Sequence, residues 1–163
     1  MTTVRHTKTS RPTIKTGEAG RGYTLDFTLR ERATGNVYVS EMKCEIEYQN
    51  FKYFVLEQVS HLAHHKKPAF EAFLRAARPT ADQTIFVGRE SITPVGAILI
   101  WGAVAPQGRD DVIKAMGFHK VLSIEEICAD LASWKCERYR ALIEQRQKWC
   151  NELFAGLLEG RAS

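Results

Sequence analysis

Apolar and polar residues alternate in two neighbouring segments near the start of the chain. Between residues 23 and 30 every second residue is Tyr, Leu or Phe, which is the period of a half-buried β-strand. The sequence ATGN follows at residues 33–36, and its Gly and Asn suit a tight turn with positive φ. Residues 37–46 are typical of the returning strand. The pattern therefore predicts a β-hairpin.

Beyond the hairpin the apolar residues change to helical spacing. Residues 54–65 are expected to form a helix, which Pro68 either kinks or replaces with a second helix at residues 69–77. Residues 83–88 are typical of a strand. The continuous apolar run at residues 95–104 is typical of a fully buried central strand.

The next segments favour a short helix and another strand. Residues 105–110 are expected to form a loop that leads into a helix ending at Gly117. A strand is expected at residues 119–122. Ser123 then begins a capping-box pattern, SIEE, which predicts the start of another helix.

The C-terminal part favours two helices joined near residues 133–137, because its apolar stripe slips phase there. The order of elements is then hairpin, helices, strand, helix, strand and helices. This order predicts an α/β domain in which helical crossovers connect the strands that follow the hairpin.

Composition places the chain among globular proteins. A length of 163 residues indicates one domain, and 44% hydrophobic with 26% charged residues indicates a packed core under a polar surface. The longest apolar run is much shorter than a membrane span, and the N-terminus lacks the apolar stretch of a signal peptide. We therefore expect a cytoplasmic protein with no membrane partner.

The excess positive charge lies at the N-terminus. Residues 1–22 hold five basic residues and one acidic residue, a net charge of +4, which leaves 18 of the 23 basic and 18 of the 19 acidic residues elsewhere. The segment lacks apolar periodicity, so we expect a basic flexible arm. Such an arm suits phosphate contacts, with an ordinary solubilising tail as the alternative. The candidate nucleic-acid contacts are Arg11, Lys15, Arg21, Lys66 and Lys67.

Three charged residues of the hairpin fall on one side of the predicted sheet. If the turn is centred within ATGN, opposed residues have numbers that sum to 69. Asp26 then faces Lys43, while Glu41 faces Thr28 and lies diagonal to Asp26. Diagonal neighbours lie roughly 7–8 Å apart at the backbone, which lets two carboxylates share one ion.

The chemistry of these three residues indicates a divalent cation. Two carboxylates held together repel each other unless a cation lies between them or one takes a proton. Mg²⁺ prefers oxygen ligands and keeps several waters, so Asp26, Glu41 and a backbone carbonyl suit it. A neighbouring lysine, here Lys43, suits the orientation or deprotonation of an attacking water whose pKa the metal lowers.

Asp26, followed after fourteen residues by Glu41-Met42-Lys43, resembles the D…(D/E)xK signature of the PD-(D/E)xK nuclease superfamily. In that family the aspartate lies on the second core strand and the ExK on the third, like the hairpin predicted here. The resemblance implies a restriction-endonuclease-like α/β fold at residues 23–134, with a mixed central sheet flanked by helices. Residues 135–163 would be a C-terminal helical extension that packs on the core or on a partner.

The resemblance also implies the roles of the site residues. Asp26, Glu41 and the carbonyl of Met42 would bind Mg²⁺, for which Mn²⁺ would substitute, and Lys43 would be the catalytic lysine. The implied activity is that of a metal-dependent endonuclease that hydrolyses phosphodiester bonds in DNA. Its partners would be DNA and either a second copy of the chain or a subunit that supplies specificity.

Two further residues match the family less closely. Glu18 is a candidate additional metal ligand, although its surroundings, GEAGRG, are too rich in glycine for the helix that carries this acid in many members. Gln58 is similar in position to a polar residue that some members use near the active site.

The charged residues of the hairpin also suit a plainer interpretation, an exposed polar face with a weak cross-strand ion pair. We favour a partly covered face because Val37 and Val39 share the side of Glu41. In either case the chain is compatible with a catalytically inactive nucleic-acid-binding or protein-interaction subunit of the same fold.

The segment HLAHHKKP raises a zinc hypothesis, because His61 and either His64 or His65 lie on one face of the predicted helix. No Cys or carboxylate accompanies them at short spacing, and two lysines follow. A basic helix end that faces solvent or phosphate is the favoured alternative.

Overall fold

The chain divides into two compact units, Met1–Ile124 and Glu125–Ser163. The predicted core extended to residue 134, so it includes the helix with which the second unit begins. The computed structural model describes residues 13–15, 22–46, 52–65, 68–78 and 84–159.

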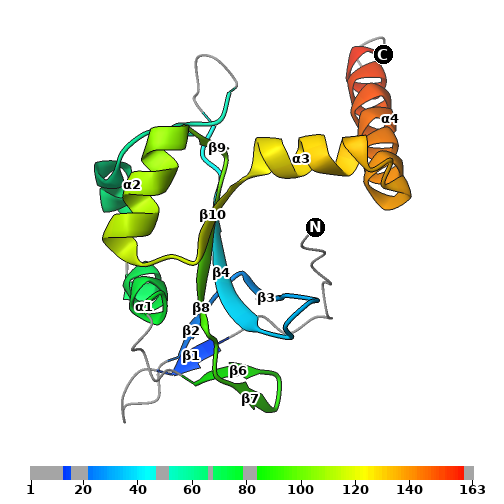
Figure 1. Ribbon diagram of the computed structural model, residues 1–163. Helices are drawn as coiled ribbons and strands as arrows, with labels where there is room; N and C mark the ends of the chain where they lie inside the picture. Colours follow the sequence, from blue (N-terminus) through cyan, green and yellow to red (C-terminus); the bar gives the residue numbers. More distant parts are fainter. Residues whose placement is uncertain (1–12, 16–21, 47–51, 66–67, 79–83, 160–163) are drawn as a thin grey trace. The chain divides into compact units, whose positions relative to one another are not determined.

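A four-stranded mixed sheet forms the centre of the first unit (Figure 1). Its strand order is β10-β8-β4-β3; β3 and β4 are antiparallel, whereas β4, β8 and β10 are parallel. The mixed α/β class predicted from the sequence is therefore confirmed. The strands of this sheet are β3 (Phe27–Arg30), β4 (Val37–Lys43), β8 (Gly96–Trp101) and β10 (Lys120–Ser123).

Two helices, α1 (Pro68–Ala76) and α2 (Pro106–Met116), lie on the same side of this sheet (Figure 1). Every residue of β8 is buried, and the strand has β4 on one edge and β10 on the other. A continuous apolar run is what such a central strand requires. Val39, Leu99 and Phe73 belong to the core between the sheet and α1, and all three are fully buried.

The predicted central strand at residues 95–104 is divided at Gly102 into β8 and β9 (Ala103–Val104). β9 pairs in parallel with β5 (Val55–Leu56) as a separate two-stranded sheet. The predicted helix at residues 54–65 is therefore wrong for its first turn, and η1 (Val59–His65) is a 3₁₀-helix. Short apolar runs suit a strand as well as a helix, and here the pairing with β9 decides.

Proline begins both helices that cover the sheet. Pro68 begins α1 and Pro106 begins α2, at positions where the missing N–H has no partner within the helix. The loop predicted at residues 105–110 is therefore wrong, because most of it forms the start of α2. Gly117 ends α2 as predicted: its φ is 79°, and its N–H donates to the carbonyl of Ile113.

A second four-stranded sheet has the order β2-β1-β6-β7. The strand predicted at residues 83–88 is confirmed as β6. Residues 1–22 were predicted to be a basic flexible arm, and within them Thr13–Lys15 is a strand too short to show periodicity in the sequence. The strands are β1 (Thr13–Lys15), β2 (Gly22–Thr24), β6 (Ile85–Val87) and β7 (Glu90–Ile92).

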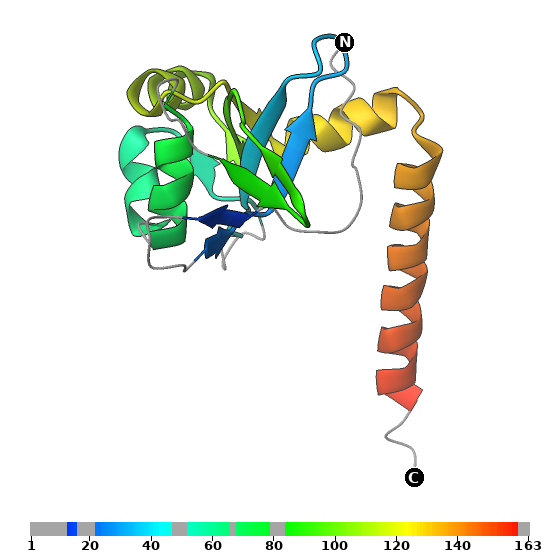
Figure 2. The same cartoon turned by 90° about the horizontal axis from the view of Figure 1, so that it is seen from below.

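Two helices, α3 (Ile124–Ser133) and α4 (Glu137–Glu159), account for the described part of the second unit. The predicted join near residues 133–137 is confirmed, and Lys135 turns the chain there with a φ of 50°. α4 is one unbroken helix (Figure 2). Among the described residues, no helix is long and apolar enough to cross a bilayer.

Candidate active site

The register of the β3–β4 hairpin differs from the prediction by two residues. Phe27 pairs with Ser40 and Arg30 with Val37, so opposed residues have numbers that sum to 67, not 69. The turn is longer than expected, because the N–H of Glu31 donates to the carbonyl of Asn36 and leaves four residues between them. A shift of two residues keeps every side chain on its predicted face of the sheet.

The corrected register brings Asp26 beside Glu41, whereas the sequence had placed it opposite Lys43. Asp26 lies immediately before β3, and its backbone N–H donates to Oε2 of Glu41 over 3.3 Å. The carboxylate of Asp26 in turn accepts a hydrogen bond from the N–H of Met42 over 2.9 Å. Two acidic residues are thus held next to each other through the backbone of both strands.

Glu41 is a nearly buried carboxylate on the core side of the sheet. Its residue is 8% exposed and shares a face with Val39, which is fully buried. Nζ of Lys43 lies 2.6 Å from Oε1 of Glu41 on that same face. The interpretation of Glu41 as part of an exposed polar face is therefore wrong, whereas the partial cover expected from the two valines is confirmed.

The backbone of Met42 faces Asp26, since its N–H donates to Oδ2 of that residue. In a strand the N–H and C=O of one residue point to the same side, and those of the next residue point to the other. The carbonyl of Lys43 accepts from the N–H of Gly102 over 3.1 Å, at the opposite edge of β4. The carbonyl of Met42 is therefore directed to the side of Asp26.

These donors fit a magnesium ion in kind and in charge. Asp26, Glu41 and Lys43 have a formal net charge of −1, so the one lysine offsets only one of the two acidic residues. Mg²⁺ is bound in proteins by one or two carboxylates and keeps several waters, so this pair with one carbonyl suffices. Among the described residues, no three His, Cys, Asp or Glu side chains gather as a metal-binding group.

Aromatic side chains surround Lys43. Its Nζ lies 5.6 Å from the ring centroid of Phe70 on α1, and its neighbour in β8 is Trp101. Trp101 is fully buried, and its Nε1 donates to the carbonyl of Phe54 over 2.8 Å. The ammonium therefore lies over the face of the Phe70 ring, which favours that position for a cation.

His65 and Glu45 lie beside this aromatic group, and the sequence interpretation did not assign them to the site. Nε2 of His65 is 3.4 Å from Oε1 of Glu45, and its ring meets the rings of Phe70 and Trp101 edge-on. The signal for Glu45 was present in the sequence, because E-x-K-x-E continues the alternation of β4 past its last residue. His65 is the last residue of η1, and no local sequence pattern indicates that its ring lies against Trp101.

The pKa of the Cys44 thiol is affected by the charge of Asp26. Burial raises the pKa of the Cys44 thiol, and the negative charge of Asp26 raises it further. The side chain belongs to the residue that directly follows β4. A change in the charge near Asp26 should therefore change the pKa of the Cys44 thiol.

The remaining predicted site residues are not brought to the carboxylates by the described structure. Gln58 is exposed just before η1, with its Nε2 3.1 Å from Nε2 of His61. His61 also contacts the carbonyl of Val55, and in the part of the chain that the structure describes it belongs to no group of three metal-binding side chains. Outside the described residues, or with side chains that are not described, are Arg11, Lys15, Glu18, Arg21, His64, Lys66 and Lys67.

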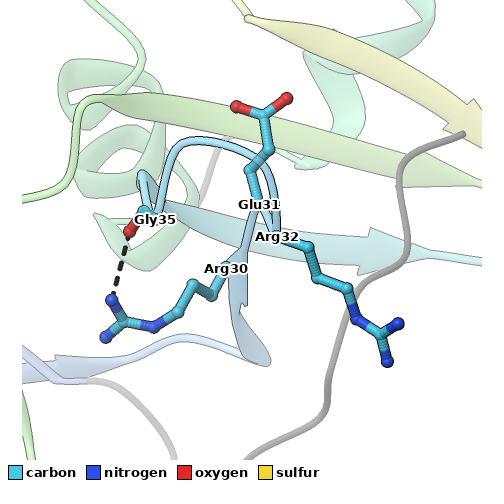
Figure 3. A pocket seen from close by; sticks show the side chains of 4 residues that line it. All are labelled: Arg30, Glu31, Arg32 and Gly35. Atoms are coloured by element: carbon cyan, nitrogen blue, oxygen red, sulfur yellow. Dashed lines mark hydrogen bonds between the residues drawn. The ribbon is translucent and has the colours of Figure 1, made fainter.

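A separate pocket lies at the β3–β4 turn, at the opposite end of β3 from Asp26 (Figure 3). Its lining residues are Arg30, Glu31, Arg32 and Gly35. Nη1 of Arg30 donates to the carbonyl of Gly35 over 3.1 Å, whereas the side chain of Arg32 points away from both (Figure 3). The pocket therefore adds exposed positive charge near the site without belonging to it.

No protein-family model, no curated protein and no solved structure matches the chain.

Proposed function

We propose that the protein is a Mg²⁺-dependent endonuclease that hydrolyses phosphodiester bonds in DNA. The observation that carries the proposal is the placement of Asp26 beside Glu41, with Lys43 on the same face at 2.6 Å from Glu41. A nearly buried carboxylate next to a second carboxylate is costly and calls for a cation.

The topology of the sheet supports the resemblance to the PD-(D/E)xK superfamily. Asp26 and the Glu41-Met42-Lys43 motif lie on the two arms of an antiparallel hairpin. The chain then passes through α1 to β8, which is parallel to β4, and through α2 to β10. A restriction-endonuclease-like core, with a hairpin followed by helical crossovers, has this order of elements.

Each site residue has a role in the proposed reaction. Asp26, Glu41 and the carbonyl of Met42 would hold Mg²⁺ in place. The ion, when bound, lowers the pKa of a coordinated water and stabilises negative charge on the phosphate. Lys43 would orient the attacking water or accept its proton, and the rings of Phe70 and Trp101 would keep the ammonium near the carboxylates.

Contacts with the DNA backbone would come from basic residues. Arg32 is exposed at the β3–β4 turn and would reach a phosphate of the same DNA segment. The residues between Asp26 and Arg30 span about 13 Å at strand rise, so the turn and the carboxylates would meet one backbone. The arm residues Arg11, Lys15 and Arg21, with Lys66 and Lys67, would add sequence-independent affinity.

Cleavage of supercoiled plasmid and of single-stranded DNA tests the proposal. Wild type should nick or linearise DNA with Mg²⁺ or Mn²⁺ and should be inactive with EDTA. Lys43→Ala should lower the rate by a factor on the order of 100 or more. Lys114→Ala, which changes an exposed lysine in the last turn of α2, is the matched control and should keep the wild-type rate.

Two results would reject the nuclease assignment. If wild type cleaves neither substrate with either metal, the protein fits the alternative of an inactive nucleic-acid-binding or protein-interaction subunit. If Lys43→Ala cleaves as fast as Lys114→Ala, the activity does not use this site.

A further inference from the structure

Within the second unit none of the side chains of α4 is buried, although the helix carries a row of large apolar residues. Leu142, Trp149, Leu153 and Leu157 are seven, four and four residues apart and lie on one face of the helix, with the other apolar residues beside them as one stripe. Most of the stability of helices in proteins comes from the packing of such an apolar stripe, not from intrinsic helix propensity. The exposed apolar residues are Leu142, Ile143, Trp149, Leu153, Phe154, Leu157 and Leu158.

The two halves of α4 carry opposite charge. Residues 137–148 contain four basic and two acidic residues, a net charge of +2. Residues 149–159 contain two acidic and no basic residues, a net charge of −2. The boundary between the halves lies at the middle of the helix.

This charge pattern is opposite to the one that stabilises a single helix. The helix macrodipole favours acidic residues near the N-terminus and basic residues near the C-terminus. In α4 the first turn holds the acidic Glu137 as well as the basic Arg138 and Arg140, and the last turn has no basic residue and ends at Glu159. Exposed ion pairs within the helix, Arg140–Glu144 and Lys148–Glu152, offset part of this unfavourable pattern. The opposite net charge of the two halves remains.

We propose that α4 pairs antiparallel with α4 of a second copy of this chain. Antiparallel pairing places the +2 half of each helix against the −2 half of the other. Parallel pairing would place like charges together along the whole length and would set Arg146, which lies within the apolar stripe, against its own copy. The charge pattern is thus self-complementary about a two-fold axis.

The size of the stripe is sufficient for a specific interface. Trp149 and Phe154 are 56% and 63% exposed, and Leu157 and Leu158 are 61% and 82% exposed. The exposed apolar residues extend from Leu142 to Leu158, about 24 Å along the helix axis, so a second helix can pack along most of α4. The inference is independent of the nuclease proposal.

Sedimentation of the full-length chain over a range of concentrations measures the association. We expect a dimer in wild type, and Leu157→Glu should raise the dissociation constant at least about 100-fold. Ala155→Glu introduces the same charge two residues away, about 200° around the helix, and should leave the dimer intact. A monomeric wild type, or equal effects of the two variants, would overturn the proposal. Circular dichroism checks that both variants stay folded.

Charge reversal tests complementarity. The variants Arg138→Glu/Arg140→Glu and Glu152→Lys/Glu159→Lys should each self-associate about 10-fold more weakly than wild type. A mixture of the two should recover the wild-type affinity, because each helix then meets halves of opposite charge. Unchanged self-association of either variant would contradict the antiparallel arrangement.

Disulfide cross-linking determines the direction of the pairing. In a Cys150→Ser background, Leu142→Cys mixed with Leu157→Cys should form a cross-linked heterodimer, because these positions lie at opposite ends of the stripe. Cross-linking of Leu157→Cys only with itself would show parallel pairing and reject the proposal. A dimer that cross-links at neither pair of positions would place the interface outside α4 and would reject it equally.

Discussion

The backbone N–H of Asp26 donates a hydrogen bond to Oε2 of Glu41 over 3.3 Å. This contact fixes two acidic residues from different strands next to each other, and Lys43 offsets only one of their charges. The cost of gathering like charges at a nearly buried position has a reason if a cation is bound there. The predictions below follow from this relationship and from the packing that supports it.

The acidity of Cys44 should respond to metal binding. Burial and the charge of Asp26 raise the pKa of the thiol, so at neutral pH the thiolate fraction lies below that of an ordinary cysteine. A bound Mg²⁺ offsets the charge of Asp26 but not the burial, so the pKa should fall and stay above its usual value. Alkylation by iodoacetamide at a fixed pH should then become about threefold faster, which is roughly half a pKa unit.

The measurement uses a chain in which Cys44 is the only cysteine, with Cys128, Cys136 and Cys150 changed to Ser. Potassium chloride at equal ionic strength controls for screening. In Asp26→Asn the rate should not respond to Mg²⁺. An equal response in this variant would show that the ion acts elsewhere.

Arg32 should contribute affinity for DNA without sequence preference. In the proposed complex Arg32→Ala removes one phosphate contact, so the slope of log affinity against log salt concentration should become shallower by about 0.9. Fluorescence anisotropy with duplexes of different sequence measures this effect. Glu31→Gln, which removes a negative charge from the same pocket, should strengthen binding. If both variants bind like wild type, the turn does not touch DNA.

Gly108 should be required for the packing of α2 on β5. A Cβ at this position would overlap the carbonyl oxygen of Leu56 and lie 2.7 Å from the Cα of Glu57, both in the backbone. Gly108→Ala should therefore lower the free energy of unfolding by about 1–3 kcal/mol in denaturant titrations.

Gly96→Ala is the matched control for this effect. Its Cβ would meet no atom closer than 3.7 Å, so its stability should stay within about 1 kcal/mol of wild type. Equal destabilisation of the two variants would show that close packing at Gly108 is not the cause.

The sequence predicts the hairpin, its buried face and the central strand because these depend on local alternation and continuous burial. The register was predicted with an error of two residues, because the same residues ATGN fit a two-residue turn and the observed four-residue loop. Because of this error Asp26 was predicted to lie opposite Lys43, whereas it lies beside Glu41; the face of the sheet was predicted correctly. The sequence therefore predicted the residues of the site and the face on which they lie, but not the direct contact between Asp26 and Glu41.

The surroundings of the site could be predicted from the sequence less well than the hairpin. Residues 55–56 pair with β9, a strand almost fifty residues later, and this long-range contact overrides their helical spacing. His65 reaches Trp101 only because the chain folds back through η1. A single sequence carries no local signal for such approaches.

The binding of Mn²⁺ to the metal-free protein, followed by electron paramagnetic resonance, tests the central claim most directly. Wild type should bind one ion per chain in competition with Mg²⁺, and Asp26→Asn and Glu41→Gln should each weaken binding at least about 10-fold. Asp110→Asn, an exposed acid on α2, should bind like wild type. Binding of Mn²⁺ that is unchanged in Asp26→Asn and Glu41→Gln, or absent from wild type, would contradict a shared ion between these carboxylates.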